Sequence, residues 1–109
     1  MDNKFLGRYI KVYRIKKGLT QAELAEMVNV AAGMIGRYER GEKIPGRDMV
    51  FELAKALEFS LDALIFKSEN MGESIFSDDF MEKLNKLTIL EQKAAINAAE
   101  AVVDTFLEK

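Results

Sequence analysis

Three basic side chains in the first half of the chain are the groups best suited to chemistry. Arg37, Arg40 and Lys43 follow one another at intervals of three residues. A guanidinium group can hydrogen-bond guanine at two atoms, and cationic side chains in general bind phosphates. Residues 1–67 hold 12 Lys and Arg against 9 Asp and Glu, a balance of +3, and residues 68–109 hold 4 against 9, a balance of −5. This asymmetry favours separate roles for the two halves, although two solvated surfaces of opposite sign are equally open on charge alone.

Composition excludes several classes of site. The 109 residues include no cysteine and no histidine, which excludes disulfides, cysteine or histidine catalysis and ordinary zinc sites. The acidic residues fall at expected helix caps and outward faces, so we expect neither enzymatic activity nor a cofactor. No apolar run reaches the roughly 18 residues of a membrane span, and the amino terminus does not have the pattern of a signal peptide. We therefore expect a cytoplasmic protein without a membrane partner.

Hydrophobic spacing predicts an all-α fold, since no stretch alternates with period two for long enough to form a strand. The expected helices lie at about 4–17, 20–28, 31–40 and 49–57, in a short fifth element from Ser60, in one from Ser77, and at about 89–107. Gly18 and Gly41 are the expected ends of the first and third helices. Thr20 and Glu23 form a capping box at the start of the second helix, and Asn29 ends it because asparagine tolerates the left-handed backbone.

These helices are expected to fall into two parts. A five-helix domain covers residues 1–67, a linker covers 68–76, and a helical segment covers 77–109. The linker is predicted because the stretch 67–74 is polar, contains glycine and lacks periodicity. Ser77 and the two aspartates after it favour a new helix start.

The series of motifs resembles a known family. A short helix opening at Thr20, a break, and a helix ending in Tyr38-Glu39-Arg40-Gly41 form a helix-turn-helix pattern. Residues 6–65, just over half of the chain, resemble the phage repressor and Cro type of helix-turn-helix domain, also called the xenobiotic-response-element type and HTH_3-like. The resemblance implies a five-helix domain like that of the lambda repressor, which binds double-stranded DNA with its third helix in the major groove.

The resemblance also implies roles for individual residues. Gln21 matches a glutamine that clamps a phosphate. Arg14 and Glu39 match a pair that forms an internal salt bridge, so we assign Arg14 to structure. The outward positions of the recognition helix are Ala32, Gly33, Gly36, Arg37 and Arg40.

This outward face offers few hydrogen-bonding groups. Alanine can contact only a thymine methyl, and glycine has no side chain to offer. Either Gly33 and Gly36 let the helix sit deeper in the groove, or direct readout has decayed; both interpretations are open. Arg37 is the candidate base reader, with a phosphate contact or a solvated charge as the alternative, whereas Arg40 and Lys43 are better suited to phosphates. We expect recognition to depend on phosphate contacts, methyl contacts and DNA shape.

The final helix carries an apolar stripe. Its members are the expected dimerisation residues Ala95, Ile96, Ala99, Val102, Val103 and Phe106. Our preferred interpretation is that the two last helices pack against a second subunit; the alternative is that they pack back on the amino-terminal domain. A two-fold dimer would read half-sites about 34 Å apart.

Two functions from different classes are consistent with these features. The first is a homodimeric, sequence-specific DNA-binding regulator, expected to repress a bacterial, phage or mobile-element promoter. The second is a protein-interaction module with the same fold and little DNA affinity, favoured by the sparse recognition helix and the net charge of −2. A regulatory protein such as an antirepressor is a further candidate partner. Salt separates the two functions, because binding through several phosphates weakens steeply as salt rises.

Overall fold

The structure, a computed structural model, describes the backbone of residues 2–107 and the side chains of residues 2–70 and 76–98. Over this range the chain is helical and forms no strand, so the predicted all-α fold is confirmed. The helices are α1 (Asn3–Lys16), α2 (Gln21–Met27), α3 (Ala32–Glu39), α4 (Arg47–Leu57), α5 (Leu61–Ile75), α6 (Asp78–Asn85) and α7 (Ile89–Leu107). Among residues 2–107, no helix combines the length and the apolar character that crossing a bilayer requires.

Local chemistry explains where α2 begins and where the first three helices end. The Thr20 hydroxyl accepts a hydrogen bond from the Glu23 backbone N–H at 3.0 Å, and the Glu23 carboxylate accepts one from the Thr20 N–H at 2.9 Å. The hydrogen bond from the Thr20 backbone is the main reason that the pKa of Glu23 lies below its usual value. Gly18, Asn29 and Gly41 have φ values of +73°, +60° and +74°. The predicted ends of these helices are confirmed.

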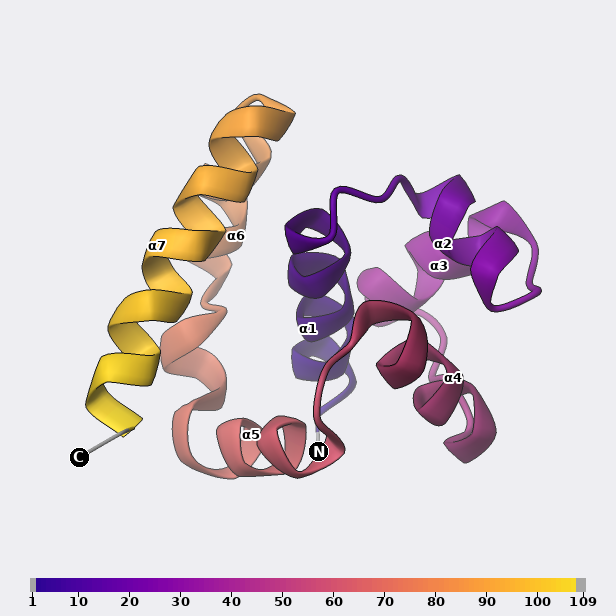
Figure 1. Ribbon diagram of the computed structural model, residues 1–109, viewed down its shortest axis with the longest axis horizontal. Helices are drawn as coiled ribbons and strands as arrows, with labels where there is room; N and C mark the ends of the chain where they lie inside the picture. The colour runs from indigo at the N-terminus through magenta and orange to yellow at the C-terminus, as the bar shows by residue number, and fades with distance from the viewer. Residues whose placement is uncertain (1, 108–109) are drawn as a thin grey trace.

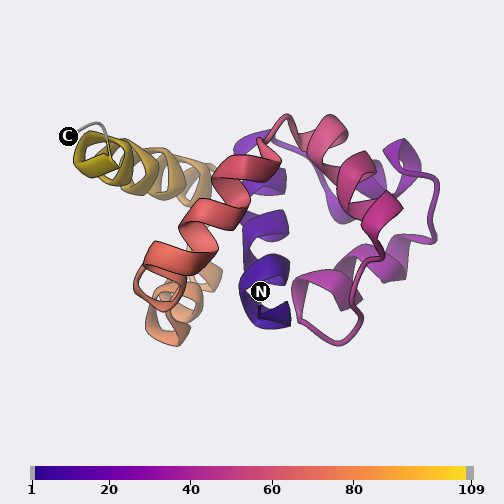
Figure 2. The ribbon, with the colours of Figure 1, turned by 90° about the horizontal axis from the view of Figure 1, so that it is seen from below.

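Helix α1 lies at the centre of the fold. Figure 1 shows the α2–α3 pair on one side of α1 and the α6–α7 hairpin on the other, and Figure 2 shows the same order from below. Tyr9 and Ile10 of α1 are fully buried, as are Leu24 of α2 and Ile35 of α3. A single core therefore extends from the helix-turn-helix side of α1 to the side covered by the C-terminal helices.

The prediction of a non-helical linker at residues 68–76 is wrong, because α5 continues through Ile75. This part of the helix could not be recognised from the sequence, because residues 67–74 are polar and show no helical spacing of apolar residues. A helix already started at Leu61 adds one hydrogen bond for each further residue, so it can propagate into a polar sequence. The Asn70 side chain also donates to the Phe66 carbonyl oxygen one turn earlier, at 2.8 Å.

Apolar contacts attach the C-terminal helices to α1 of the same chain. The ring centroid of Phe76 lies 5.4 Å from that of Phe5 and 6.1 Å from that of Tyr9. Met81 of α6 and Ile96 of α7 are buried in the same core. Residues 76–98 therefore pack back on the amino-terminal domain, which is the second of the two arrangements considered from the sequence.

Polar contacts reinforce this attachment along α1. Arg8 donates to the Phe76 carbonyl oxygen and, through Nη2, to the Asp78 carboxylate, with which it forms an ion pair. The hydrogen bond from Arg8 to Asp78 is the main cause that lowers the pKa of Asp78. One turn further, the Lys11 ammonium donates to the Asn85 side chain at 2.6 Å, while burial lowers the pKa of Lys11. The acidic C-terminal segment is thus attached to α1 on the side away from α3 (Figure 1).

Candidate nucleic-acid interface

Helices α2 and α3 form the helix-turn-helix unit, whose geometry depends on the break between them. Asn29 adopts the left-handed backbone, and the Val30 N–H donates to the Ala25 carbonyl oxygen at 3.0 Å, which closes the end of α2. Ile35 and Tyr38 on the inner face of α3 are buried. The turn therefore sets α3 against the core by one face and leaves the other face for a ligand.

A buried carboxylate ties α1, α2 and α3 together. Glu39 accepts hydrogen bonds from Arg14 Nε at 2.6 Å and from Arg14 Nη2 at 3.1 Å, and the Gln21 amide donates to it at 3.0 Å. Arg14 Nη1 also donates to the Leu19 carbonyl oxygen at 2.8 Å. The side chains of Arg14 and Glu39 are only 12% and 3% exposed. The pair implied by the family resemblance is thus an internal link that fixes the orientation of α3.

Gln21 belongs to the same network and also borders the outer face of α3. Its amide nitrogen is engaged by Glu39, whereas its side-chain oxygen lies close to Gly36. The residue as a whole is exposed. The structure therefore leaves Gln21 accessible, and its contact with a phosphate stays a prediction.

Six of the seven predicted DNA-binding residues are exposed, and Gly36 is the exception. Ala32, Gly33 and Arg37 lie on the exposed face of α3, and Lys43 lies in the loop that follows. A Cβ atom on Gly33 would have no other atom within 4 Å. Among Ala32, Gly33 and Arg37, only Arg37 has a long polar side chain, so this face of α3 offers few hydrogen-bonding groups.

Gly36 differs from the other predicted DNA-binding residues because it is buried, although its Cβ direction faces two exposed side chains, Arg40 and Gln21. A Cβ atom at this position would lie 3.0 Å from Arg40 Nη1 and 3.4 Å from Gln21 Oε1. Two neighbouring side chains therefore cover the space that Gly36 leaves empty. Helical spacing alone could not foresee this, because the covering groups come from α2 and from the end of α3.

Sequence reasoning missed Glu42, which lies beside Arg40. Arg40 Nε donates to Glu42 Oε2 at 2.7 Å, and Arg40 Nη2 donates to Glu42 Oε1 at 3.3 Å. The hydrogen bond to Arg40 is the main cause that lowers the pKa of Glu42, and it raises that of Arg40. The available signal was Gly41, since a glycine that ends a helix in the left-handed conformation turns the next residue back toward the last turn.

The expected dimerisation residues occupy different environments. Ile96 is buried within its own chain, so the prediction that it faces a second subunit is corrected, and Ala95 is half-buried against the same core. The side chains of Ala99, Val102, Val103 and Phe106 lie outside the described residues. Helical spacing in the sequence predicts an apolar stripe, but it does not identify the surface that covers this stripe.

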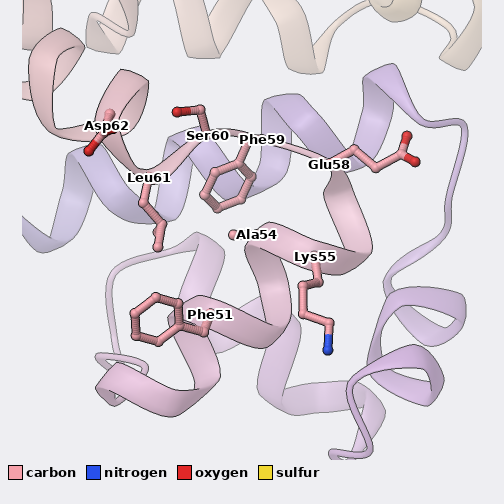
Figure 3. A pocket seen from close by; sticks show the side chains of 8 residues that line it. All are labelled: Phe51, Ala54, Lys55, Glu58, Phe59, Ser60, Leu61 and Asp62. Atoms are coloured by element: carbon pink, nitrogen blue, oxygen red, sulfur yellow. The ribbon is translucent and has the colours of Figure 1, made fainter.

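A surface hollow of about 550 Å³ lies between the end of α4 and the start of α5 (Figure 3). Phe51 and Leu61 contribute apolar surface to it, and Lys55, Glu58 and Asp62 contribute charges of both signs. None of the predicted DNA-binding residues borders this hollow. The hollow is therefore separate from the exposed face of α3.

Comparison with known proteins points to the same unit of the chain. Residues 10–64 match the helix-turn-helix family HTH_3. The chain is 36% identical over 72 residues to multiprotein-bridging factor 1 of Candida albicans, an alignment that covers 66% of this chain and 44% of that protein. It is 31% identical over 64 residues to the uncharacterized HTH-type transcriptional regulator YazB of Bacillus subtilis, covering 59% of this chain and 93% of that protein. It is 35% identical over 65 residues to repressor protein C2 of Salmonella phage P22, covering 60% of this chain and 30% of that protein.

The fold has a similar solved structure. The crystal structure of the clp gene regulator ClgR from Corynebacterium glutamicum matches with a TM-score of 0.63 and 23% sequence identity, and the match covers 77% of this chain and 89% of that chain. The chain spans less than half of the length of the Candida protein. The sequence match, the left-handed break after α2 and the buried Arg14–Glu39 pair concern the same segment. The chain belongs to the HTH_3 family of helix-turn-helix proteins.

Proposed function

We propose that this protein is a sequence-specific DNA-binding transcriptional regulator, a repressor that binds operator DNA as a homodimer with α3 in the major groove. Membership of the HTH_3 family and the regulator and repressor names of its relatives support a DNA-binding transcriptional regulator. An α-helix fits the major groove of B-DNA, which is about 12 Å wide.

The observation that carries the proposal is the exposed face of α3 on a rigid support. The buried Glu39 holds α3 to α1 and α2, while the basic groups Arg37, Arg40 and Lys43 remain exposed on one helix end and its loop. The acidic C-terminal segment lies on the far side of α1 (Figure 1). DNA can therefore approach α3 without meeting that segment, and the local positive charge favours phosphate contacts.

Recognition on this face depends on few side chains. Arg37 can hydrogen-bond guanine at two atoms, and Ala32 can contact a thymine methyl. Gln21 and Lys43 are suited to the sugar–phosphate backbone. The remaining specificity comes from DNA shape, because glycine at position 33 allows close approach without offering a hydrogen bond.

A homodimer compensates for this sparse readout. Two recognition helices related by a two-fold axis double the base contacts and read half-sites one helical turn apart. With Ile96 buried in its own chain, we propose the later part of α7 as the dimer interface. The spacing of Ala99, Val102 and Phe106 in the sequence supports this choice.

A protein-interaction module is the second candidate function. The bare surface at Ala32 and Gly33 favours it, and so does the pairing of Arg40 with Glu42, which partly neutralises the basic end of α3. The name of the Candida relative, multiprotein-bridging factor 1, points in the same direction for that protein. If the affinity for DNA were the same at low and high salt, this result would contradict the phosphate contacts and the proposed DNA-binding regulator.

Selection on a random duplex pool tests the proposed function directly. The full-length protein is incubated with the pool at about 100 mM salt, where phosphate contacts are still effective, and the retained duplexes are sequenced. We expect an inverted repeat whose half-sites are about 10 base pairs apart, as a two-fold dimer requires. A pool recovered without any enriched sequence would reject the regulator in favour of the interaction module.

Arg37 and Lys43 are expected to make different kinds of contact with the selected site. Arg37→Ala should remove about 1–3 kcal/mol of discrimination at one base position, because a two-point hydrogen bond to guanine is lost. Lys43→Ala should weaken all duplexes by a similar factor and reduce the slope of log K against log salt by about 1. Titrations of both variants against the selected and scrambled duplexes measure these effects. Identical behaviour of the two variants would contradict the assignment.

A further inference from the structure

The guanidinium of Arg40 lies between Glu42 and Gly36. Glu42 accepts hydrogen bonds from Nε and Nη2, at 2.7 Å and 3.3 Å. The third nitrogen, Nη1, lies over Gly36, 3.0 Å from the place that a Cβ atom would occupy. The carboxylate therefore engages the Nε side of the guanidinium, while Nη1 lies against the surface of α3.

Gly36 provides the space for this arrangement. An alanine methyl group would lie 3.0 Å from Arg40 Nη1, which is closer than ordinary van der Waals contact, and 3.4 Å from Gln21 Oε1, at the short end of ordinary contact. Ordinary contact between non-bonded heavy atoms is about 3.5–4.0 Å. The missing side chain at position 36 is thus replaced on the surface of α3 by the guanidinium of Arg40.

The backbone position of Glu42 is fixed by two hydrogen bonds at the end of α3. The Gly41 N–H donates to the Tyr38 carbonyl oxygen at 3.1 Å, and the Glu42 N–H donates to the Arg37 carbonyl oxygen at 2.9 Å. This pair of bonds around a left-handed glycine is the Schellman ending of a helix. The Glu42 side chain therefore starts from a defined point beside Arg40 instead of from a free loop.

We propose that Arg40 is a base-reading residue and that Glu42 positions it for this role. The missing side chain of Gly36 leaves room for the guanidinium of Arg40 against α3. This inference rests on the proposed DNA-binding function and deepens it, because it differs from the phosphate contact expected for Arg40. Glu42 uses two of the five N–H donors of the guanidinium, so three donors remain for a base edge. An arginine that is already oriented loses less rotamer freedom when it binds, which favours a directional contact with guanine over a diffuse contact with a phosphate.

The ionic state of the pair agrees with this role. The hydrogen bond from Arg40 holds the pKa of the Glu42 carboxyl below its usual value, so the carboxylate stays charged at neutral pH and continues to orient the guanidinium. The pair is exposed, and exposed pairs contribute little to folding stability. A variant of either residue is therefore expected to fold, and its effect on DNA binding can be measured cleanly.

The test compares Arg40→Lys and Glu42→Gln with the wild type on two duplexes of equal length. One duplex carries the sequence enriched from the random pool, and the other carries the same bases in scrambled order; both are titrated by fluorescence anisotropy at one salt concentration. Glu82→Gln on α6 is the matched control, because it removes the same charge from an exposed ion pair on the other side of α1. Thermal unfolding of each variant verifies that it is folded.

Arg40→Lys is expected to keep its affinity for the scrambled duplex within about twofold and to lose about tenfold on the enriched duplex, since lysine retains the charge but not the two-point geometry. Glu42→Gln is expected to bind the scrambled duplex at least as tightly as the wild type and still to lose several-fold in the ratio of the two affinities. The double variant should lose no more discrimination than Arg40→Lys alone, because the two residues act as one unit. Glu82→Gln should change neither affinity.

Two results would overturn the inference while leaving the proposed function intact. If the wild type discriminates and Arg40→Lys does so equally well, Arg40 is a phosphate contact only. If Glu42→Gln tightens both duplexes by the same factor, Glu42 acts as a repulsive charge and not as a positioning residue. A wild type that binds both duplexes equally would instead reject the proposed function together with this inference.

Discussion

Arg14→Ala is expected to reduce the free energy of unfolding by about 3–5 kcal/mol, the range observed when one partner of a buried ion pair is removed. The variant would leave the Glu39 carboxylate, 3% exposed, with the Gln21 amide as its remaining hydrogen-bond donor among the interactions described above. It would also remove the hydrogen bond from Arg14 to the Leu19 carbonyl oxygen. Urea denaturation followed by circular dichroism measures the loss.

The control for this prediction replaces both charges. Arg14→Met combined with Glu39→Met leaves no uncompensated carboxylate, and buried ion pairs replaced by apolar residues of similar size often fold as well as the parent protein. The double variant should therefore recover most of the stability that Arg14→Ala loses. If Arg14→Ala costs less than about 1 kcal/mol, the value of an exposed pair, the carboxylate is hydrated and the pair is not the link between helices that its burial indicates.

The parts of the fold that could be predicted from the sequence are those determined by local chemistry. Gly18, Asn29 and Gly41 end helices because their own backbone conformations demand it, and the capping box of Thr20 and Glu23 needs no distant residue. The extension of α5 through Ile75 could not be predicted in the same way, because the sequence of that stretch is polar and has no helical apolar spacing. Helical periodicity identifies a buried face, not every helical residue.

The candidate site could be predicted only in part for a related reason. Arg37 and Lys43 are exposed as the spacing indicates, since nothing else in the described structure covers them. Gly36 is different, because its burial depends on two long side chains that reach it from other turns. The C-terminal stripe posed the same difficulty at a larger scale. Ile96 was correctly placed on an apolar face, but it is buried within its own chain, where α7 contacts α1, and this partner could not be identified from one sequence.

Gly7→Ala is expected to be the second most damaging single change outside the apolar core. Gly7 lies where α1 crosses the end of α3, and a Cβ atom there would lie 2.3 Å from the Tyr38 carbonyl oxygen and 2.7 Å from that of Glu39. Both are backbone atoms, so no side-chain rotation can relieve the overlap. Helix α1 would have to move away from α3, and this movement would also stretch the Arg14–Glu39 pair. Overpacking of this kind costs about 1–3 kcal/mol and occasionally more.

The expected loss for Gly7→Ala is at the upper end of that range, because the new methyl group would overlap two backbone oxygens that cannot rotate away. The higher helix propensity of alanine offsets only about 1 kcal/mol of this cost. A loss of 3 kcal/mol in a domain of about 100 residues lowers Tm by roughly 12–24 °C, which thermal unfolding measures readily. Gly33→Ala is the matched control, since it makes the same chemical change on a helix with open space around it and should raise Tm. A Gly7→Ala variant as stable as Gly33→Ala would mean that α1 and α3 do not approach so closely. The support that orients the recognition helix would then have to lie in α2 and the turn alone.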